Sequence, residues 1–360
     1  MRKWLFFLSR NKCKVCVYAW IRAAAGRNNI AMKQTETIRK KIRGAGSLVL
    51  LAALVCTLSA CGNQESEKED DGTYHVGICQ WEEHAALDEA TTGFQEALTD
   101  KLGDEVVFDV QIAQGNTQDC QEILNGFVAD EADLIMANAT SALMAASQAT
   151  NTIPIVATSI TDYGTALNMR EWTGASGINV TGTSDLAPIE SQAVMIMELV
   201  PEAAKVGILY CSAETNSIYQ AQKMSSTLTD KGITIGTYTI ADKTQLEKTA
   251  QKAASECDVL YIPTDNTIAS QADILKDILI SAKVPMIAGE EGLCEAGIAT
   301  LSISYYDIGY TAGEMAYEIL AEGKDPGEIE VRYAENVTKK YNPENCEALG
   351  ITVPDDYEAL

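Results

Sequence analysis

Short apolar runs alternate with longer amphipathic stretches along the chain from about residue 74 onward. The runs, of which 76–79 (VGIC) is the first, have the length and the β-branched content of buried strands. The stretches between them show the 3.6-residue period of helices with one apolar face. Because strands and helices alternate, the pattern predicts parallel sheets flanked by helices, and therefore the α/β fold class.

The alternating pattern occurs twice. The runs at 76–79 and 206–209 each precede a predicted helix that ends in the tetrapeptide LTDK. Three more strand-like runs follow in the same order in each copy, at 106–112, 133–136 and 153–156 in the first and at 233–240, 258–261 and 284–287 in the second. A repeat as long as a whole domain favours two Rossmann-like lobes over one continuous sheet of about eight strands.

The end of the chain is expected to return to the first copy. A helix predicted over 306–320 has a period that suits packing against the first lobe. The segments 177–182 (GINVTG) and 300–305 would then be crossovers that form a hinge, because glycine and short polar residues tolerate rotation; ordinary surface loops are the alternative. The expected first lobe is 74–180 with about 303–324, and the expected second lobe is 181–302 with about 325–360.

The first 60 residues have the pattern of an export signal rather than of a fold. An apolar run at 48–58 follows a cluster of basic residues at 39–43 and is too short to span a bilayer comfortably. The sequence LSACG that follows resembles the bacterial lipobox, so Cys61 is expected to carry a lipid; an uncleaved signal anchor is the alternative. Translation is expected to start at Met32, and 61–73 is expected to be a disordered tether.

The charge of the chain narrows the choice of partners. The formal net charge is −24, and 15 basic against 50 acidic residues remain after residue 60. A protein this acidic repels nucleic acid and anionic lipid, and it lacks the basic surface that either partner needs. Nucleic acid is therefore excluded as a partner, and membrane attachment is expected only through the lipid anchor.

The sequence contains no recognisable catalytic or metal-binding motif. No glycine-rich dinucleotide loop, phosphate loop or nucleophile elbow follows a predicted strand. The chain has only two histidines, His75 and His84, and neither has a partner at metal-ligand spacing. The six cysteines beyond Cys61 are scattered singly and are expected to be mostly free, buried thiols. We therefore expect no enzyme activity, no metal and no cofactor.

Candidate ligand-binding residues follow from the predicted topology. In parallel α/β sheets, ligands bind at the carboxyl ends of the strands, where loops meet helix N-termini. The side chains predicted there are mostly hydroxyls, amides and carboxylates that would form a polar clamp between the lobes, although such residues also cap helices. The candidates are Gln80, Trp81, His84, Asn138, Thr140, Ser141, Ser159, Thr161, Asp162, Asn216, Ser217, Thr264, Asp265, Asn266, Glu290 and Tyr305.

Several segments resemble a known protein family. The motifs are QWEEHAALD at 80–88, IPIV at 153–156, NVTG at 179–182, ETNS at 214–217 and PTDNT at 263–267. They resemble the bacterial ABC-transporter substrate-binding proteins typified by the tryptophan/tyrosine-type binding lipoproteins, over almost the whole chain beyond the leader. The chain departs from the family at the positions where members often have proline, which are Ala85, Ser141 and Tyr163.

The resemblance implies a type I periplasmic-binding-protein fold whose two lobes close on an amino acid, with aromatic amino acids among the candidates. It also implies an extracytoplasmic, lipid-anchored protein that delivers its ligand to an ABC permease and its ATPase. Two alternatives remain open, a ligand-sensing module for a membrane receptor and a binding protein for another small metabolite such as a nucleoside or sugar. An extracellular enzyme on the same scaffold is the third alternative.

An amino acid in such a cleft needs acceptors for its ammonium group and donors for its carboxylate. The candidates for the ammonium group are Asp162, Asp265, Asn266 and Glu290, and those for the carboxylate are Thr140, Ser141, Ser159 and backbone N–H groups. The candidates for an aromatic wall are Trp81, Tyr305 and Tyr306, with core packing as the alternative. Only Arg170 and Arg332 lie beyond the leader, so an arginine clamp is not expected unless Arg170 folds inward.

Overall fold

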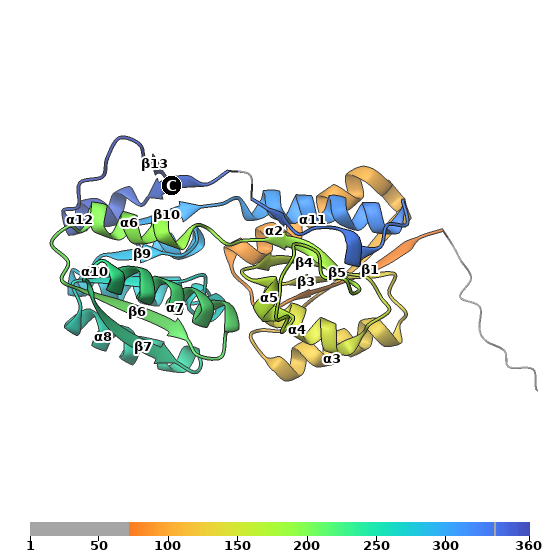
Figure 1. Cartoon of the computed structure of the whole chain (residues 1–360), viewed down its shortest axis with the longest axis horizontal. Coiled ribbons are helices and arrows are strands. Elements are labelled where there is room, and N and C mark those ends of the chain that lie inside the picture. Colours follow the sequence, from red (N-terminus) through yellow and green to blue (C-terminus); the bar gives the residue numbers. More distant parts are fainter. Residues whose placement is uncertain (1–71, 335) are drawn as a thin grey trace, which may run out of the picture. The chain divides into compact units, whose positions relative to one another are not determined.

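The computed structural model describes residues 72–334 and 336–360. The expected leader, the expected lipidation site Cys61 and most of the expected tether lie outside these residues. The described residues belong to one compact unit and form two sheets covered by helices (Figure 1). Among the described helices, none combines the length and the hydropathy that a membrane crossing needs.

The first sheet has six strands, and all of its neighbouring strands pair in parallel. Their spatial order is β11 (Arg332–Tyr333), β5 (Val180–Ser184), β4 (Ile155–Ile160), β3 (Leu134–Asn138), β1 (Tyr74–Gln80) and β2 (Val106–Ile112). One face packs against α2 (Ala85–Leu102) and α11 (Tyr305–Leu320), and the other against α3 (Thr117–Ala129) and α4 (Thr140–Ala149) (Figure 1). The central strands are buried on both faces, which is why they are continuous apolar runs in the sequence.

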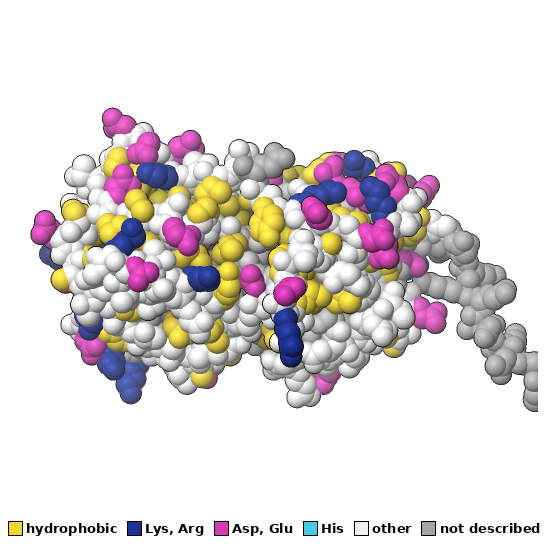
Figure 2. All heavy atoms as spheres, in the orientation of Figure 1, with side chains coloured by type: hydrophobic (Ala, Val, Ile, Leu, Met, Phe, Trp, Pro, Cys, Tyr) yellow, Lys and Arg dark blue, Asp and Glu magenta, His cyan; other side chains and the backbone are white. Residues whose placement is uncertain are grey.

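The second sheet has seven strands, of which only β12 pairs antiparallel to its neighbour β10. Their order is β13 (Glu358–Ala359), β12 (Thr338–Tyr341), β10 (Ala299–Ser302), β9 (Met286–Ala288), β8 (Val259–Ile262), β6 (Lys205–Cys211) and β7 (Thr234–Ile240). The helices of this lobe are α6 (Ile189–Leu199), α7 (Thr215–Asp230), α8 (Leu246–Glu256), α9 (Asn266–Ala269), α10 (Ala272–Ala282) and α12 (Pro343–Leu349). Acidic side chains are spread over both lobes on the face drawn in Figure 2.

Both sheets repeat one strand order. The series β2-β1-β3-β4-β5 in the first sheet corresponds to β7-β6-β8-β9-β10 in the second. A parallel sheet with this order and with helices on both faces is a doubly wound, Rossmann-like arrangement. The predicted α/β fold with two Rossmann-like lobes is therefore confirmed.

The membership of the two sheets differs from the expected lobe boundaries at two places. Residues 181–184, expected in the second lobe, belong to β5 of the first sheet, and β11 also returns to the first sheet. The chain therefore passes between the lobes after β5, after β10 and after β11. Strand β11 has only 2 residues, so it leaves no periodic pattern in the sequence.

The glycine content of 177–182 is the reason why the sequence predicts a hinge where β5 lies. Gly182 lies inside β5 with a φ of +147°, and a Cβ atom there would overlap the carbonyl oxygen of Ala157 on β4. The glycine thus permits a close approach between two strands instead of a rotation. The expected crossover at 300–305 is shorter than predicted, because 299–302 form β10.

The six cysteines beyond Cys61 are free and buried. The sulfur atoms of Cys79 on β1 and Cys120 on α3 are 3.6 Å apart. Burial raises the pKa of the Cys346 thiol to about 11. These thiols therefore pack as small hydrophobic groups.

Two glycines bring α2 and α11 into close contact. A Cβ atom at Gly93 would overlap the carbonyl oxygen of Tyr306, and one at Gly309 would overlap that of Ala90. Helix α11 also packs onto the first sheet, as the sequence predicted for residues 306–320. The last long helix of the chain is thereby fixed to the lobe that contains the first strand.

We expect Gly309→Ala to lower the free energy of unfolding by about 1–3 kcal/mol, because the added methyl group forces the two helices apart. Gly126→Ala is the matched control, since Gly126 lies in α3 and a Cβ atom there would meet no neighbouring atom within 4 Å. That change should stabilise the protein by about 0.5–1 kcal/mol through helix propensity. Urea unfolding of both variants measures the effect, and equal stabilities would contradict the close packing.

Candidate binding cleft

The strand-end loops of the two sheets contact each other. Nε2 of Gln220 on α7 donates to the hydroxyl of Thr161, which follows β4, over 3.3 Å. Nε2 of His84, which precedes α2, lies 3.1 Å from Oδ1 of Asn266 at the start of α9. Two further contacts join Lys243 to Glu82, 3.8 Å apart, and Thr215 to the sulfur of Met144, 3.6 Å apart. The carboxyl ends of both sets of strands therefore border one interface.

Unpartnered polar atoms are concentrated at this interface. Within residues 72–334 and 336–360, seven buried side-chain nitrogen or oxygen atoms lack a hydrogen-bond partner. Six belong to residues predicted from the strand-end rule, namely Trp81 Nε1, His84 Nδ1, Asn138 Oδ1, Thr140 Oγ1, Ser159 Oγ and Asn216 Oδ1; the seventh is Thr300 Oγ1. Since buried polar groups are nearly always hydrogen-bonded in proteins, this concentration is typical of a place where a ligand supplies the partners.

Two hydroxyl groups and a helix N-terminus lie together in the first lobe. Thr140 begins α4, and the residue before it, Ala139, has a φ of +88° and provides no side-chain cap. Ser159 lies in β4 with a φ of +60°, where the register between β4 and β5 shifts. Non-glycine residues with such φ values are strained and are enriched at functional sites. Uncapped N–H groups and free hydroxyls can bind an anionic group.

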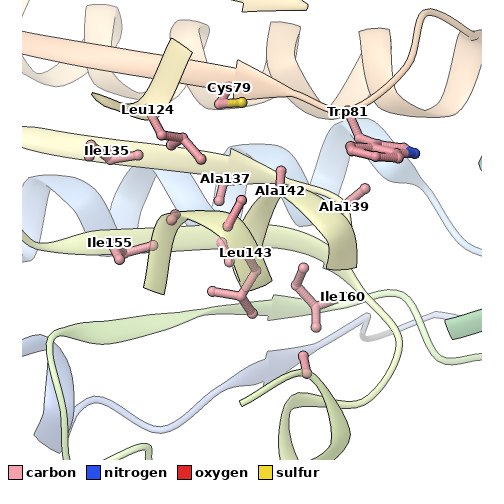
Figure 3. Packing of buried hydrophobic residues seen from close by; sticks show 14 of the residues in the cluster. Cys79, Trp81, Leu124, Ile135, Ala137, Ala139, Ala142, Leu143, Ile155 and Ile160 are labelled. Carbon is pink, nitrogen blue, oxygen red and sulfur yellow. The ribbon is translucent and has the colours of Figure 1, made fainter. Parts of the chain in front are cut away.

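Trp81 directly follows β1, and its backbone N–H donates to the carbonyl oxygen of Asn138 at the end of β3. Its side chain is 7% exposed and packs with the hydrophobic core of the first lobe. Figure 3 shows the indole at the strand-end edge of that core, beyond Cys79 and near Ala139. The ring therefore offers an apolar face at the interface together with an unpartnered N–H donor.

Asp185 is a buried carboxylate that the sequence analysis missed. It follows β5, is 4% exposed, and accepts hydrogen bonds from the hydroxyls of Thr161 and Tyr305, each over 3.0 Å. None of the ion pairs formed within the described part of the chain involves it. Burial raises the pKa of Asp185 to about 6. The strand-end rule would have named this residue if 180–184 had been recognised as a strand.

Glu214 organises the facing loops of the second lobe. One carboxylate oxygen accepts from the backbone N–H and the hydroxyl of Thr267, both over 2.7 Å. The other accepts from the backbone N–H and the side-chain amide of Asn266, over 3.1 and 2.7 Å, and from the amide of Asn216 over 3.1 Å. These hydrogen bonds to Glu214 fix the positions of both asparagines. Glu214 itself is not among the residues that the sequence predicts for the site.

Three predicted carboxylates act within turns and helix caps. Asp162 accepts from Thr165 N at the start of α5 (Tyr163–Ala166), and Asp265 accepts from Ile268 N at the start of α9. Glu290 accepts from Gly292 N and Leu293 N, both over 2.6 Å. Burial raises the pKa of Asp265 to about 8 and that of Glu290 to about 7. The observed contacts of these three residues are therefore those of helix caps and turns, which is the alternative to ligand binding.

The remaining predicted residues have varied surroundings. Gln80 is hydrogen-bonded within the first lobe to Glu82, Asp88 and Thr91. Ser217 and Asn216 donate to the carbonyl oxygen of Thr264, whose N–H and hydroxyl donate to Gln220. Ser141 is half-buried in the first turn of α4. Arg170 is exposed and Arg332 pairs with Glu318, so neither arginine contributes to the cleft.

A hollow of about 780 Å³ lies beside the crossovers that follow β5, β10 and β11. Tyr306 lines this hollow and donates to Glu96 over 2.6 Å, so it contributes no aromatic wall to the cleft. Lys340 and Glu291 in its wall are paired at 2.8 Å. In the described part of the chain, no group of three or more His, Cys, Asp or Glu residues could hold a metal ion.

We expect Asp185→Asn to stabilise the ligand-free protein near neutral pH. The folded-state pKa of about 6 lies above the unfolded value of 3.8, so ionisation of Asp185 favours unfolding, and the penalty grows as the pH rises from 4 through 6. The variant should therefore match the wild type near pH 4 and exceed its stability at pH 7.5 by up to about 3 kcal/mol. Urea unfolding at both pH values, with the exposed Asp109→Asn as control, measures this; a stability difference independent of pH would contradict it.

Known proteins with similar sequences share one activity. Residues 75–359 match the family described as ABC transporter substrate binding protein. A protein of Clostridioides difficile (strain R20291) named tyrosine-binding protein is 34% identical over 295 residues, which cover 81% of this chain and 85% of that protein. Such proteins bind solutes outside the cytoplasm and are not enzymes.

Solved structures lead to the same assignment. The ABC domain from Streptococcus pneumonia in complex with L-Trp is 28% identical, with a TM-score of 0.75, and the match covers 79% of this chain and 96% of that one. A ligand-free, open structure of a substrate-binding protein with adhesive properties from Clostridium difficile is 31% identical, with a TM-score of 0.61 and coverages of 80% and 99%. The duplicated lobes, the polar interface between them and these matches lead to one conclusion: the chain belongs to the substrate-binding proteins of ABC transporters.

Proposed function

We propose that the chain binds an aromatic amino acid, tyrosine or tryptophan, between its two lobes and delivers it to an ABC importer. The observation that carries this proposal is the buried carboxylate of Asp185, which has no cationic partner among residues 72–334 and 336–360 and lies in the same interface as unpartnered hydroxyl donors. A buried charge is costly unless an opposite charge accompanies it. A zwitterion supplies the missing cation together with an anion for the donors.

The two ends of an amino acid have separate partners in this proposal. Asp185 has two hydroxyl donors, one to each oxygen, and so retains lone pairs for an ammonium group. Thr140, Ser159 and the uncapped N-terminus of α4 supply donors for the carboxylate without any arginine. Asn216 Oδ1, from the second lobe, is a further acceptor for the ammonium group.

The aromatic class of the ligand is supported by the relatives and by Trp81. One relative is named for tyrosine, and one similar structure contains L-Trp. In this chain the indole of Trp81 lies at the strand-end edge of the first core, where it can stack on a ligand ring (Figure 3).

Contacts between the lobes support a closed arrangement. The pairs Gln220–Thr161 and His84–Asn266 join the two lobes at the cleft. The TM-score against the tryptophan complex, 0.75, is also higher than the TM-score of 0.61 against the open, ligand-free relative, although the sequence identities of 28% and 31% are similar. Ligand binding would then shift the population toward this closed form, which the importer recognises.

Membrane attachment belongs to the same proposal. The apolar run at 48–58 and the following LSACG sequence favour export and lipidation at Cys61. The lipid would hold the protein beside the permease and the ATPase of the importer. Labelling with a radioactive or clickable fatty acid, lost in Cys61→Ala, tests the anchor.

We expect L-tyrosine or L-tryptophan to raise the melting temperature of the chain from residue 62 onward, since a ligand that binds only the folded state stabilises it. Tyramine, which lacks the carboxylate, and 3-(4-hydroxyphenyl)propionate, which lacks the ammonium group, should have no effect at the same concentration. Asp185→Asn should weaken binding by about 1.5–3 kcal/mol in calorimetry, through loss of the charged acceptor, whereas Asp109→Asn should not. If neither amino acid shifts the transition, the aromatic assignment is wrong.

Affinity should also depend on pH. The pKa of Asp185 is about 6 in the ligand-free protein, and an ammonium group beside it favours the ionised form. Binding therefore requires loss of a proton below pH 6, and the affinity should fall about tenfold per pH unit there. Calorimetry at pH 7.5 and pH 5 measures this dependence, and Asp185→Asn should flatten it. A wild-type affinity that is constant between these values would exclude Asp185 as the partner of the ammonium group.

A further inference from the structure

His84 stands at a helix start but does not cap the helix. A residue at the N-cap of a helix commonly accepts a hydrogen bond from a backbone N–H in the first turn. The ring of His84 makes no such bond to α2. Instead, its Nε2 atom contacts Oδ1 of Asn266 on the opposite lobe, over 3.1 Å.

The surrounding hydrogen bonds determine which ring nitrogen carries the hydrogen. The side-chain nitrogen of Asn266 donates to Glu214 over 2.7 Å, and this carboxylate can only accept, so the amide oxygen is the atom that faces His84. An amide oxygen cannot donate, and Nε2 of His84 must therefore carry the hydrogen. Burial lowers the pKa of His84, against the opposing effects of the hydrogen bond to Asn266 and of the charges of Glu214 and Asp88, so the neutral ring is favoured near neutral pH. Nδ1 is then a bare acceptor.

This acceptor has no partner among the residues that the structure describes. Nδ1 is buried, and no hydrogen bond reaches it from any residue in 72–334 or 336–360. It belongs to the same strand-end loop as Trp81, three positions earlier, whose indole N–H is also unpartnered. Neither histidine is visible on the face drawn in Figure 2. A buried acceptor in this loop is satisfied when a bound molecule supplies a donor.

We propose that Nδ1 of His84 accepts a hydrogen bond from the side chain of the ligand and so selects aromatic amino acids that carry an O–H or N–H group. This inference rests on the proposed function, in which Asp185 and the donors near α4 bind the main-chain groups of the ligand. Tyrosine has a phenol O–H and tryptophan an indole N–H, whereas phenylalanine has neither. A site that hydrogen-bonds a substrate group discriminates against the analogue without it, because the buried partner is then left unsatisfied.

Two substitutions separate this role from the contact between the lobes. In His84→Gln, the amide nitrogen can keep the hydrogen bond to Asn266, but the acceptor at the Nδ1 position is lost. In His84→Asn, the shorter side chain places its amide oxygen near the Nδ1 position and loses the contact with Asn266. The first variant therefore removes the acceptor, and the second removes the contact between the lobes.

Calorimetry with L-tyrosine, L-phenylalanine and O-methyl-L-tyrosine on all three proteins tests the inference. The wild type should bind tyrosine about 10- to 100-fold more tightly than phenylalanine. His84→Gln should lose most of that preference for tyrosine. His84→Asn should bind both tyrosine and phenylalanine more weakly but keep the preference. O-methyl-L-tyrosine, which has no donor, should bind the wild type no better than phenylalanine does.

The outcomes distinguish this inference from the proposed function. Equal wild-type affinities for tyrosine and phenylalanine, or a ratio that His84→Gln leaves intact, overturn the role of His84 while aromatic amino acid binding stands. Absence of binding for every aromatic amino acid overturns both. Circular dichroism melting of the two variants shows whether a loss of affinity comes from unfolding.

Discussion

A carboxylate inside a protein needs donors or a cation, and the described residues give Asp185 only donors. The hydroxyls of Thr161 and Tyr305 each donate to one of its oxygens. Asp185 lies on the first passage between the lobes and Tyr305 directly follows the second, so one hydrogen-bond network joins the two passages. The hydroxyls keep the carboxylate in place without neutralising it, which leaves its charge without a counter-ion among the described residues.

The same network extends to the second lobe. The hydroxyl of Thr161 donates to Asp185 and accepts from Gln220, whose own side-chain oxygen accepts from Thr264. Hydrogen bonds in such a chain polarise one another, so the contact with Gln220 strengthens the bond from Thr161 to the carboxylate. A side chain of the second lobe thereby supports the hydroxyl that holds Asp185 in the first.

Most of the fold could be predicted because it depends on periodicity. Buried parallel strands and amphipathic helices leave strong patterns, and the duplication was visible in the repeated LTDK segments and strand runs. The exceptions have local causes: Gly182 was interpreted as a hinge residue although it serves strand contact, and β11 is too short for any pattern. The error in β5 then hid Asp185, since a residue after an unrecognised strand is not recognised as a strand-end residue.

The predicted site residues could not be ranked from the sequence, because caps and ligand partners have the same composition. Asp162, Asp265 and Asn216 all follow predicted strands, yet the first two cap short helices and the third has an unpartnered oxygen. Only hydrogen-bond partners distinguish these cases. His84 illustrates the point further, since its role depends on the tautomer that Glu214 and Asn266 impose from the other lobe.

The return of α11 and β11 to the first sheet has a consequence for how the protein is made. Neither lobe is a continuous stretch of chain, and the first lobe lacks a helix and an edge strand until residue 333 is present. A growing or partly exported polypeptide therefore exposes the face of β1, β3 and β4 that α11 covers in the finished molecule. Completion of the fold is delayed until nearly the whole polypeptide is available.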